Sequence, residues 1–246
     1  MFYHLLMTKQ SKNSLKLASK IIKLENSIST KQQLQLAQQI SLYDIYGEEA
    51  LMELLIKRRI IQNLDFSSLD SILFEILYTS TSEKVQQTLQ SYFFNGIVEL
   101  KTSLKIDHQP LQNLLMVQNY KEADRLTQIQ LCKLAGLDRY SKRDWLYFTD
   151  IPLLPSDDLF TIDLLWRMYS RDKFGFSRQR QIWLTNSSDW EKFWFQIGWT
   201  TQGVARRYPD EFMWDINAPQ GHLPLFNQLR GVQVLSALFD HIAWNK

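Results

Sequence analysis

The pattern of apolar and polar residues in the first hundred positions is that of short amphipathic helices. Apolar residues recur there at spacings of three and four, as they do on one face of a helix. Ser80 and Glu83 form a candidate capping box, and Asn95-Gly96 is a typical helix stop. Because successive short antiparallel helices stack into a bundle or a HEAT-like solenoid, residues 29–96 are predicted to be an N-terminal helical domain. The helical segments are 34–45, 50–61, 68–78 and 83–94.

The second half is also helical, with longer connections. Residues 97–109 have weak periodicity and precede Pro110, which makes them the best linker candidate, followed by a core domain over 110–246. Strand-like alternation is absent, so the predicted fold class is all-α, with a helical bundle or HEAT-like domain before the core. Helices are predicted at 111–117, 122–135, 157–169, 178–184, 188–197 and 226–242, with Ser188 and Glu191 as a second capping box and with loops at 137–155 and 200–223.

The stretch from Asp157 to Gln179 organises this core. Its first half is an amphipathic helix, for which Ser156 stands at the N-cap position. Its second half, Phe174 to Ser177, places a glycine between two aromatic residues, where the backbone can turn without the strain that a Cβ would cause. Ser177 is placed to cap a further helix that begins near residue 178.

Composition narrows the class of protein. With 45% hydrophobic residues the chain can bury a sizeable core, and its net charge of +2 argues against a strongly electrostatic nucleic-acid binder. The single cysteine, Cys132, has no disulfide partner, which favours a reducing compartment. No apolar run approaches the roughly 20 residues that span a membrane. We therefore expect a soluble protein.

The N-terminal segment, residues 1–28, is basic. It contains five lysines and no acidic residue before Glu25. A transit peptide has a similar charge but is usually rich in arginine, and the first arginine here is Arg58. Both interpretations stay open, and a solvated basic helix is favoured.

Motifs of catalysis are missing. There is no glycine-rich phosphate loop or nucleophile elbow. Paired acids such as Asp157-Asp158 and Asp210-Glu211 are typical of solvated helix starts and turns. The four histidines have no metal-ligand spacing: His4, His108, His222 and His241. We therefore expect a protein that is not an enzyme and that holds no metal through its own side chains.

Binding chemistry is present instead. All eight tryptophans lie at or after Trp145. Arginine beside exposed aromatic rings suits a flat apolar ligand that carries carboxylates. The alternative is a solvated loop whose rings fold back onto the helices; single-stranded nucleic acid fits less well with the near-neutral charge. The loop after Trp199 contains Arg206, Arg207, Tyr208, Phe212, Trp214 and His222.

The order of several motifs resembles the core domain of the Genomes Uncoupled Four family of tetrapyrrole-binding proteins. Tyr120 stands where this family has a tryptophan, which is a mild departure. The helical N-terminal half resembles the extra domain of the cyanobacterial and algal plastid members. The motifs are Asn119 to Asp124, Trp145, Asp158-Leu159, Thr161 to Asp163, Leu165-Trp166, Tyr169-Ser170, Phe174 to Ser177, Gln179, Ile197 to Trp199 and Ala218 to Pro224.

The resemblance implies a cupped helical core whose loops enclose protoporphyrin IX or Mg-protoporphyrin IX. It implies a non-catalytic activator of magnesium chelatase in chlorophyll biosynthesis and photosynthesis, acting through the large porphyrin-binding subunit of that enzyme. The expected location is the plastid (chloroplast) stroma, with plastid encoding, or a cyanobacterial cytoplasm. We expect a monomer without a nucleic-acid partner, and peripheral membrane association is left open.

The same resemblance assigns roles to individual residues. Phe174, Phe176, Trp199 and Trp214 would contact the macrocycle or shape its groove, together with Trp145. Arg206, Arg207 or Arg230 would meet the propionates. Gln179, with Asp163, would hold helices and loops in place, and His222 would cap its turn in preference to reaching the ligand. The alternatives are a helical protein-interaction scaffold, with the N-terminal solenoid as its surface, and a regulator that binds a linear bilin.

Overall fold

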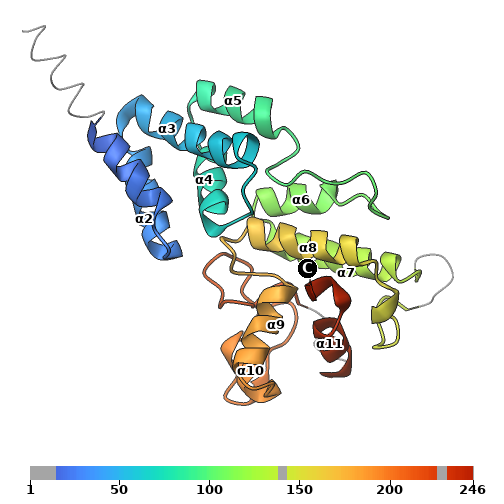
Figure 1. Ribbon diagram of the computed structural model, residues 1–246. Coiled ribbons are helices and arrows are strands. Elements are labelled where there is room, and N and C mark those ends of the chain that lie inside the picture. Colours follow the sequence, from blue (N-terminus) through green and yellow to red (C-terminus); the bar gives the residue numbers. More distant parts are fainter. Residues whose placement is uncertain (1–14, 138–142, 226–231, 246) are drawn as a thin grey trace, which may run out of the picture. The chain divides into compact units, whose positions relative to one another are not determined.

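Helices form almost all of the regular structure in the computed structural model, which describes residues 15–137, 143–225 and 232–245. The chain divides into two units, Met1–Ile97 and Val98–Lys246 (Figure 1). Within the described residues, one pair of two-residue strands accompanies the helices. The predicted all-α class is therefore confirmed.

The first unit is a stack of short helices around α4. Residues 15–25 are helical, and α4 packs against α2, α3 and α5. Seven of its eleven residues are buried, including Ile72, Leu73 and Leu77, so this helix supplies much of the core of the unit. The elements are α2 (Thr30–Ser41), α3 (Asp44–Ile56), the π-helical turn η1 (Lys57–Ile61), α4 (Ser68–Tyr78) and α5 (Glu83–Phe93).

Two local expectations for this unit were wrong. The predicted break between the helices 34–45 and 50–61 is absent, because Gly47 lies inside α3, where a Cβ would come within 2.0 Å of the Ile40 carbonyl oxygen. The glycine is therefore required by the close passage of one helix past another. Helix α5 is capped by Ser82 and not by Ser80, because α5 begins at Glu83 and the Val85 amide donates to Ser82 Oγ.

The second unit is built on α7 and α8. The Trp166 indole of α8 donates a 3.0 Å hydrogen bond to Thr127 of α7, and the Tyr120 ring stacks on Trp166 at 6.0 Å. Helix α6 packs against both α7 and α8. The elements are α6 (Gln109–Met116), α7 (Tyr120–Leu134), the 3-10 turn η2 (Ile151–Leu153), α8 (Ser156–Met168), α9 (Phe176–Thr185), α10 (Trp190–Gln196), β1 (Thr200–Thr201), β2 (Val204–Ala205), α11 (Val232–Phe239) and the 3-10 turn η4 (Ile242–Asn245).

The segment before α6, residues 97–108, has no helix and is tied to α8 by a buried histidine. His108 Nε2 lies 2.9 Å from Asp158 Oδ1, and its Nδ1 faces Gln130 Oε1 at 3.2 Å. The Lys105 amide also donates to the Asp158 carboxylate. A side chain at the start of α8 therefore holds the irregular segment by hydrogen bonds that replace backbone pairing.

Three caps in this unit differ from the sequence prediction. Ser156 is the first residue of α8, with Pro155 at the N-cap. Helix α9 begins at Phe176 behind Gly175, so Ser177 is a helix residue that bonds Asp163 instead of capping. In α10 the cap is Asp189, whose carboxylate accepts from two backbone amides, and not Ser188. Each cap lies within two residues of the predicted one, as is usual for helix ends.

Among the described helices, none is both long enough and apolar enough to cross a membrane.

Candidate functional site

Helix α10 brings four aromatic residues into one short segment. Its sequence, Trp190-Glu-Lys-Phe-Trp-Phe-Gln196, places rings on both faces, because residues that are adjacent in a helix point about 100° apart. Phe193 is fully buried, whereas Phe195 is 70% exposed. The helix therefore carries a buried aromatic face and an exposed one.

The buried face rests on an aromatic cluster. Trp190 stacks on Phe239 of α11 with ring centroids 6.0 Å apart and planes 12° from parallel, and it lies 5.0 Å from Trp183 of α9. Phe193 meets Phe239 edge to face at 5.8 Å and Trp199 at 6.3 Å. Such contacts contribute roughly 0.5–1.5 kcal/mol each beyond burial. The cluster therefore fixes α10 and the start of the next loop.

Immediately after α10, a tight hairpin forms. Strands β1 and β2 pair antiparallel, with Thr200 opposite Ala205 and Thr201 opposite Val204. The two turn residues, Gln202 and Gly203, have φ values of 51° and 77°, as the favoured two-residue hairpin turns require. This hairpin lies inside the segment that was predicted to be a loop throughout.

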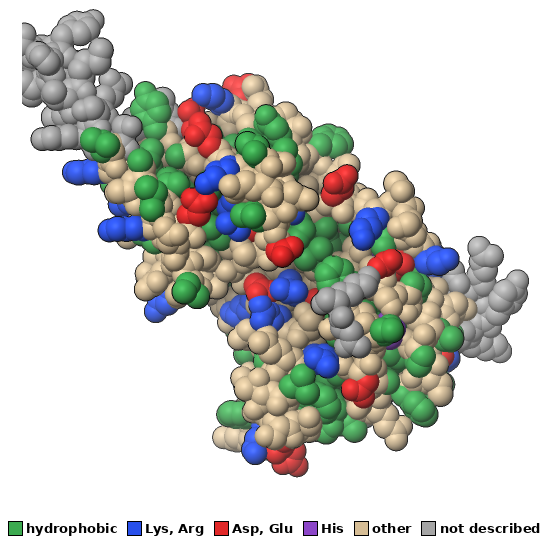
Figure 2. Space-filling view, in the orientation of Figure 1, with side chains coloured by type: hydrophobic (Ala, Val, Ile, Leu, Met, Phe, Trp, Pro, Cys, Tyr) green, Lys and Arg blue, Asp and Glu red, His purple; other side chains and the backbone are tan. Residues whose placement is uncertain are grey.

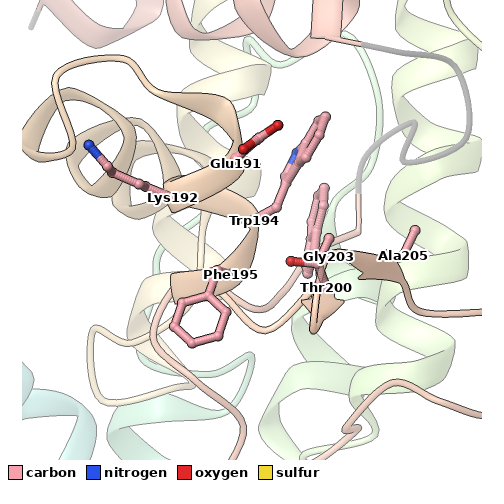
Figure 3. A pocket seen from close by; sticks show the side chains of 8 residues that line it. Glu191, Lys192, Trp194, Phe195, Thr200, Gly203 and Ala205 are labelled. Atoms are coloured by element: carbon pink, nitrogen blue, oxygen red, sulfur yellow. The ribbon is translucent and has the colours of Figure 1, made fainter.

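A groove of about 520 Å³ lies between α10 and this hairpin. Trp194 and Phe195 come from α10, and Thr200, Gly203 and Ala205 come from the hairpin (Figure 3). The volume lies within the range of small-molecule sites, about 300–1,000 Å³. The remaining lining residues are Glu191, Lys192 and Trp199. Three of the eight lining residues are therefore aromatic, and a lysine and a glutamate are also among them. Figure 2 shows apolar side chains gathered at the surface where Figure 1 places α10.

His222 fixes the loop that follows the hairpin. Its Nδ1 lies 2.6 Å from the Ile197 carbonyl oxygen, its Nε2 accepts from the Met213 amide at 3.1 Å, and its own carbonyl accepts from the Trp199 indole at 2.8 Å. Burial lowers the pKa of His222 and keeps the imidazole neutral. The histidine is thus fully buried and holds both ends of the loop.

Gln179 holds the end of this loop from the other side. Its amide nitrogen donates to the carbonyl oxygens of Gly221 at 3.0 Å and Pro224 at 2.8 Å. The Gly175 amide donates to the Leu223 carbonyl at 2.9 Å. The segment Gly221 to Pro224 is therefore clipped onto the start of α9.

Asp124 of α7 binds the residue that follows this segment, Leu225. The Leu225 amide donates to its carboxyl group at 2.6 Å, and burial raises the pKa of Asp124 to about 8. Burial also raises the pKa of Tyr208, and the nearby charge of Asp124 adds to this effect. The loop therefore lies close to α7 as well as to α9.

The structure separates the predicted site residues into two groups. Trp199 lines the groove, and Arg206 is held beside it, because the Arg206 amide donates to the Trp199 carbonyl at 2.9 Å. Arg207 is exposed in the same loop, and the indole of the partly buried Trp214 donates to the Pro209 carbonyl. These residues remain candidates for ligand contact.

The other predicted residues lie away from the groove lining. Phe174 and Phe176 are fully buried, and Phe174 meets the Tyr120 ring edge to face at 5.4 Å. Gln179 and His222 are fully buried and hold the loop in place through hydrogen bonds. Trp145 is in the connection before η2, where its carbonyl accepts from Arg143. Arg230 lies outside the described residues.

Sequence reasoning missed the outward face of α10. Trp194 and Phe195 fall inside the predicted helix 188–197 and were not named as site residues, and Gly203 and Ala205 fall inside the predicted loop 200–223. One signal was present: Trp190 to Phe195 contains aromatic residues at more consecutive positions than a single buried face can hold.

Comparison with known proteins assigns the family. The GUN4-like family model matches residues 101–242. The chain is 46% identical to Ycf53 of Porphyra purpurea over 221 residues, 90% of this chain and 92% of that protein. It is 37% identical over 143 residues to an Arabidopsis thaliana protein named "Tetrapyrrole-binding protein, chloroplastic", with 54% of each chain covered. The structure of GUN4 from Chlamydomonas reinhardtii matches with a TM-score of 0.55 at 40% identity, covering 61% of this chain and 95% of that one.

The described fold is helical, and its second unit carries a groove lined in part by aromatic residues. The chain belongs to the GUN4-like family.

Proposed function

We propose that this protein binds a tetrapyrrole without transforming it, and that the groove between α10 and the hairpin is the site. The observation that supports the proposal is the aromatic lining of a 520 Å³ groove inside the family-matched region. Trp194, Phe195 and Trp199 would cover the faces of a flat macrocycle. The Arabidopsis relative named for tetrapyrrole binding agrees with this choice.

The charges around the groove suit the carboxylates of such a ligand. Lys192 lines it directly, Arg206 is held beside Trp199, and Arg207 follows in the chain. Ammonium and guanidinium groups can pair with two propionates; Lys192 Nζ lies 3.4 Å from Asp189, and Arg206 Nη1 donates to the Glu211 carbonyl. Within the described residues, no group of histidine, cysteine or acidic side chains could hold a metal ion.

The preferred ligands are protoporphyrin IX and Mg-protoporphyrin IX, and the proposed role is activation of magnesium chelatase through its large porphyrin-binding subunit. This finer assignment rests on the family, because a chelatase activator must hold the substrate or product of that enzyme. The proposed location is the plastid stroma or a cyanobacterial cytoplasm, in agreement with the chloroplastic relative.

The first experiment is a titration with each porphyrin, in which tryptophan fluorescence quenching and the shift of the Soret band are measured. All tryptophans lie at or after Trp145, so quenching reports on the second unit. Saturable one-to-one binding is the expected result. Phe195→Ala should weaken it roughly tenfold through loss of ring contact. Phe94→Ala is the matched control, since Phe94 is 81% exposed at the end of α5 in the first unit.

Two further outcomes of this titration distinguish the porphyrin proposal from a bilin-binding protein and from an interaction scaffold. A linear bilin that binds more tightly than either porphyrin would change the ligand class. No saturable change with any tetrapyrrole would favour the interaction-scaffold alternative. With binding established, the rate of magnesium insertion by chelatase should rise with wild-type protein and rise less with the Phe195→Ala variant.

A further inference from the structure

A second cleft of about 280 Å³ lies in the second unit between α8, α9 and η4. It shares no lining residue with the aromatic groove. The side chains that matter for its chemistry are Asp163, Arg167, Arg180, Leu184, Thr185 and Trp244. Residues 163 and 167 are one turn apart on α8, and residues 180 and 184 are one turn apart on α9, so each helix presents one face to the cleft.

Both arginines are anchored through Nε. Arg167 Nε donates to Asp172 Oδ1 at 2.7 Å, and Arg180 Nε donates to the Phe239 carbonyl at 2.6 Å. In the described part of the chain, the hydrogen bonds of these two guanidinium groups are made by Nε and not by the terminal nitrogens. Arg167 Nη1 lies 3.9 Å from Asp163 Oδ2, which is an ion-pair distance. A guanidinium held at Nε keeps its terminal N–H groups in a fixed orientation for an oxyanion.

The acid in the cleft is already engaged. Asp163 accepts hydrogen bonds from the Ser177 amide at 2.8 Å and from the Ser177 hydroxyl at 2.6 Å. Burial raises the pKa of Asp163. Even with Asp163 ionised, two arginines and one acid line the cleft. Asp172 is shared between Arg167 and Arg178, whose Nε donates to it at 3.0 Å. The cleft therefore has an excess of positive charge.

The rest of the lining is apolar. Leu184 of α9 and Trp244 of η4 both line the cleft, and the Trp244 indole nitrogen is already bonded to the Leu238 carbonyl. A water molecule occupies about 30 Å³ of liquid, so a volume of 280 Å³ exceeds what a bare inorganic ion needs. The cleft thus combines fixed cationic donors with an apolar wall.

We propose that this cleft binds a small organic anion, a carboxylate or phosphate ester joined to an apolar group. Its oxygens meet Arg167 and Arg180, and its apolar part lies against Leu184 and Trp244. The site is separate from the tetrapyrrole groove.

Calorimetric titration of the full chain with phenyl phosphate and with benzoate, at constant ionic strength, tests the assignment. One-to-one saturable binding is expected, tighter than that of inorganic phosphate, and the tighter of the two probes identifies the anion class. Arg180→Gln should weaken binding about tenfold, the size expected for one charge-assisted contact. The control is Arg125→Gln, an exposed arginine of α7 paired with Glu122. Absence of saturable binding, or equal weakening by both variants, overturns the proposal.

Arg180→Gln also removes the hydrogen bond to the Phe239 carbonyl, so a loss of anion binding in this variant could come from unfolding. A second variant tests the site without removing that bond. Thr185 is exposed and lines the cleft, so Thr185→Glu adds a competing carboxylate without disturbing the core. This variant should lose anion binding while its circular dichroism and its protoporphyrin titration stay unchanged. Unchanged anion affinity would overturn the site, and joint loss of anion and porphyrin binding would overturn its separation from the groove.

Discussion

Met213 donates its backbone N–H to Nε2 of His222 across 3.1 Å, and this bond fixes the tautomer of a fully buried imidazole. Because Nε2 accepts, the ring hydrogen is on Nδ1, which donates to the Ile197 carbonyl. A second proton would have to sit on Nε2, facing the N–H of Met213. The histidine therefore holds the loop that follows the hairpin only in its neutral form.

Acidification should destabilise the protein through His222. Burial lowers its pKa below the value of about 6.5 expected in the unfolded chain, so below that pH the unfolded state binds more protons. The free energy of unfolding is then fully retained above pH 6.5 and falls as the pH drops toward the folded pKa. Urea unfolding of wild type and His222→Gln at pH 7.5 and pH 5.5 measures the effect as a difference between the two proteins, because the opposite contribution of Asp124 is present in both.

The His222→Gln variant should be less stable at neutral pH by roughly 1–3 kcal/mol and should lose part of this pH dependence. Burial also lowers the pKa of His241, so His222→Gln should still lose some stability on acidification through His241. Adding His241→Gln should remove that loss and leave the opposite dependence that comes from Asp124. An unchanged pH profile in His222→Gln would contradict the assignment.

Asp124 should have the opposite pH dependence. Its folded pKa of about 8 lies above the unfolded value of about 3.9, so between these pH values the folded state binds more protons. Its contribution to the free energy of unfolding therefore falls as the pH rises toward 8. Asp124→Asn keeps an acceptor for the Leu225 amide and should gain stability relative to wild type over that range, levelling above pH 8. The exposed Asp240→Asn is the control, and an equal gain there would argue against burial as the cause.

Gly175 should be intolerant of any side chain. Its φ is 125°, and a Cβ would lie 2.8 Å from Asp163 Oδ1 and 3.0 Å from Arg167 Cγ. Gly175→Ala should therefore lower the free energy of unfolding by more than the roughly 1 kcal/mol typical of positive-φ glycines. Gly136→Ala is the matched control, since its φ is 78° but no atom lies within 4 Å of its Cβ. Equal losses in thermal unfolding would show that the close contact is unimportant.

Gln179 should act through the loop and not through the ligand. Its amide donates to two buried carbonyl oxygens, so Gln179→Glu replaces two donors with an acceptor and should cost about 2–4 kcal/mol. Gln181→Glu, on the exposed face of the same helix, should be nearly neutral. Chemical unfolding measures both. A stable Gln179→Glu variant that loses porphyrin binding alone would instead make Gln179 a ligand contact.

The sequence by itself predicted the helical class, because apolar spacings of three and four allow few other structures. It also placed a glycine turn at Phe174 to Ser177. It expected His222 to cap its own turn, whereas the ring nitrogens bond Ile197 and Met213, which lie outside that turn. Caps moved by one or two residues, as Ser82 and Asp189 show, since neighbouring polar residues compete for the same amide groups.

Tertiary structure decided which aromatic residues face solvent. Phe174 and Phe195 both stand in aromatic-rich segments, yet the first is fully buried and the second is 70% exposed. Periodicity assigns residues to faces, but the packing partners decide which face is covered, and here Phe239, distant in sequence, covers one side of α10. The groove exists because a two-residue hairpin, too short for an alternating pattern, folds against the other side.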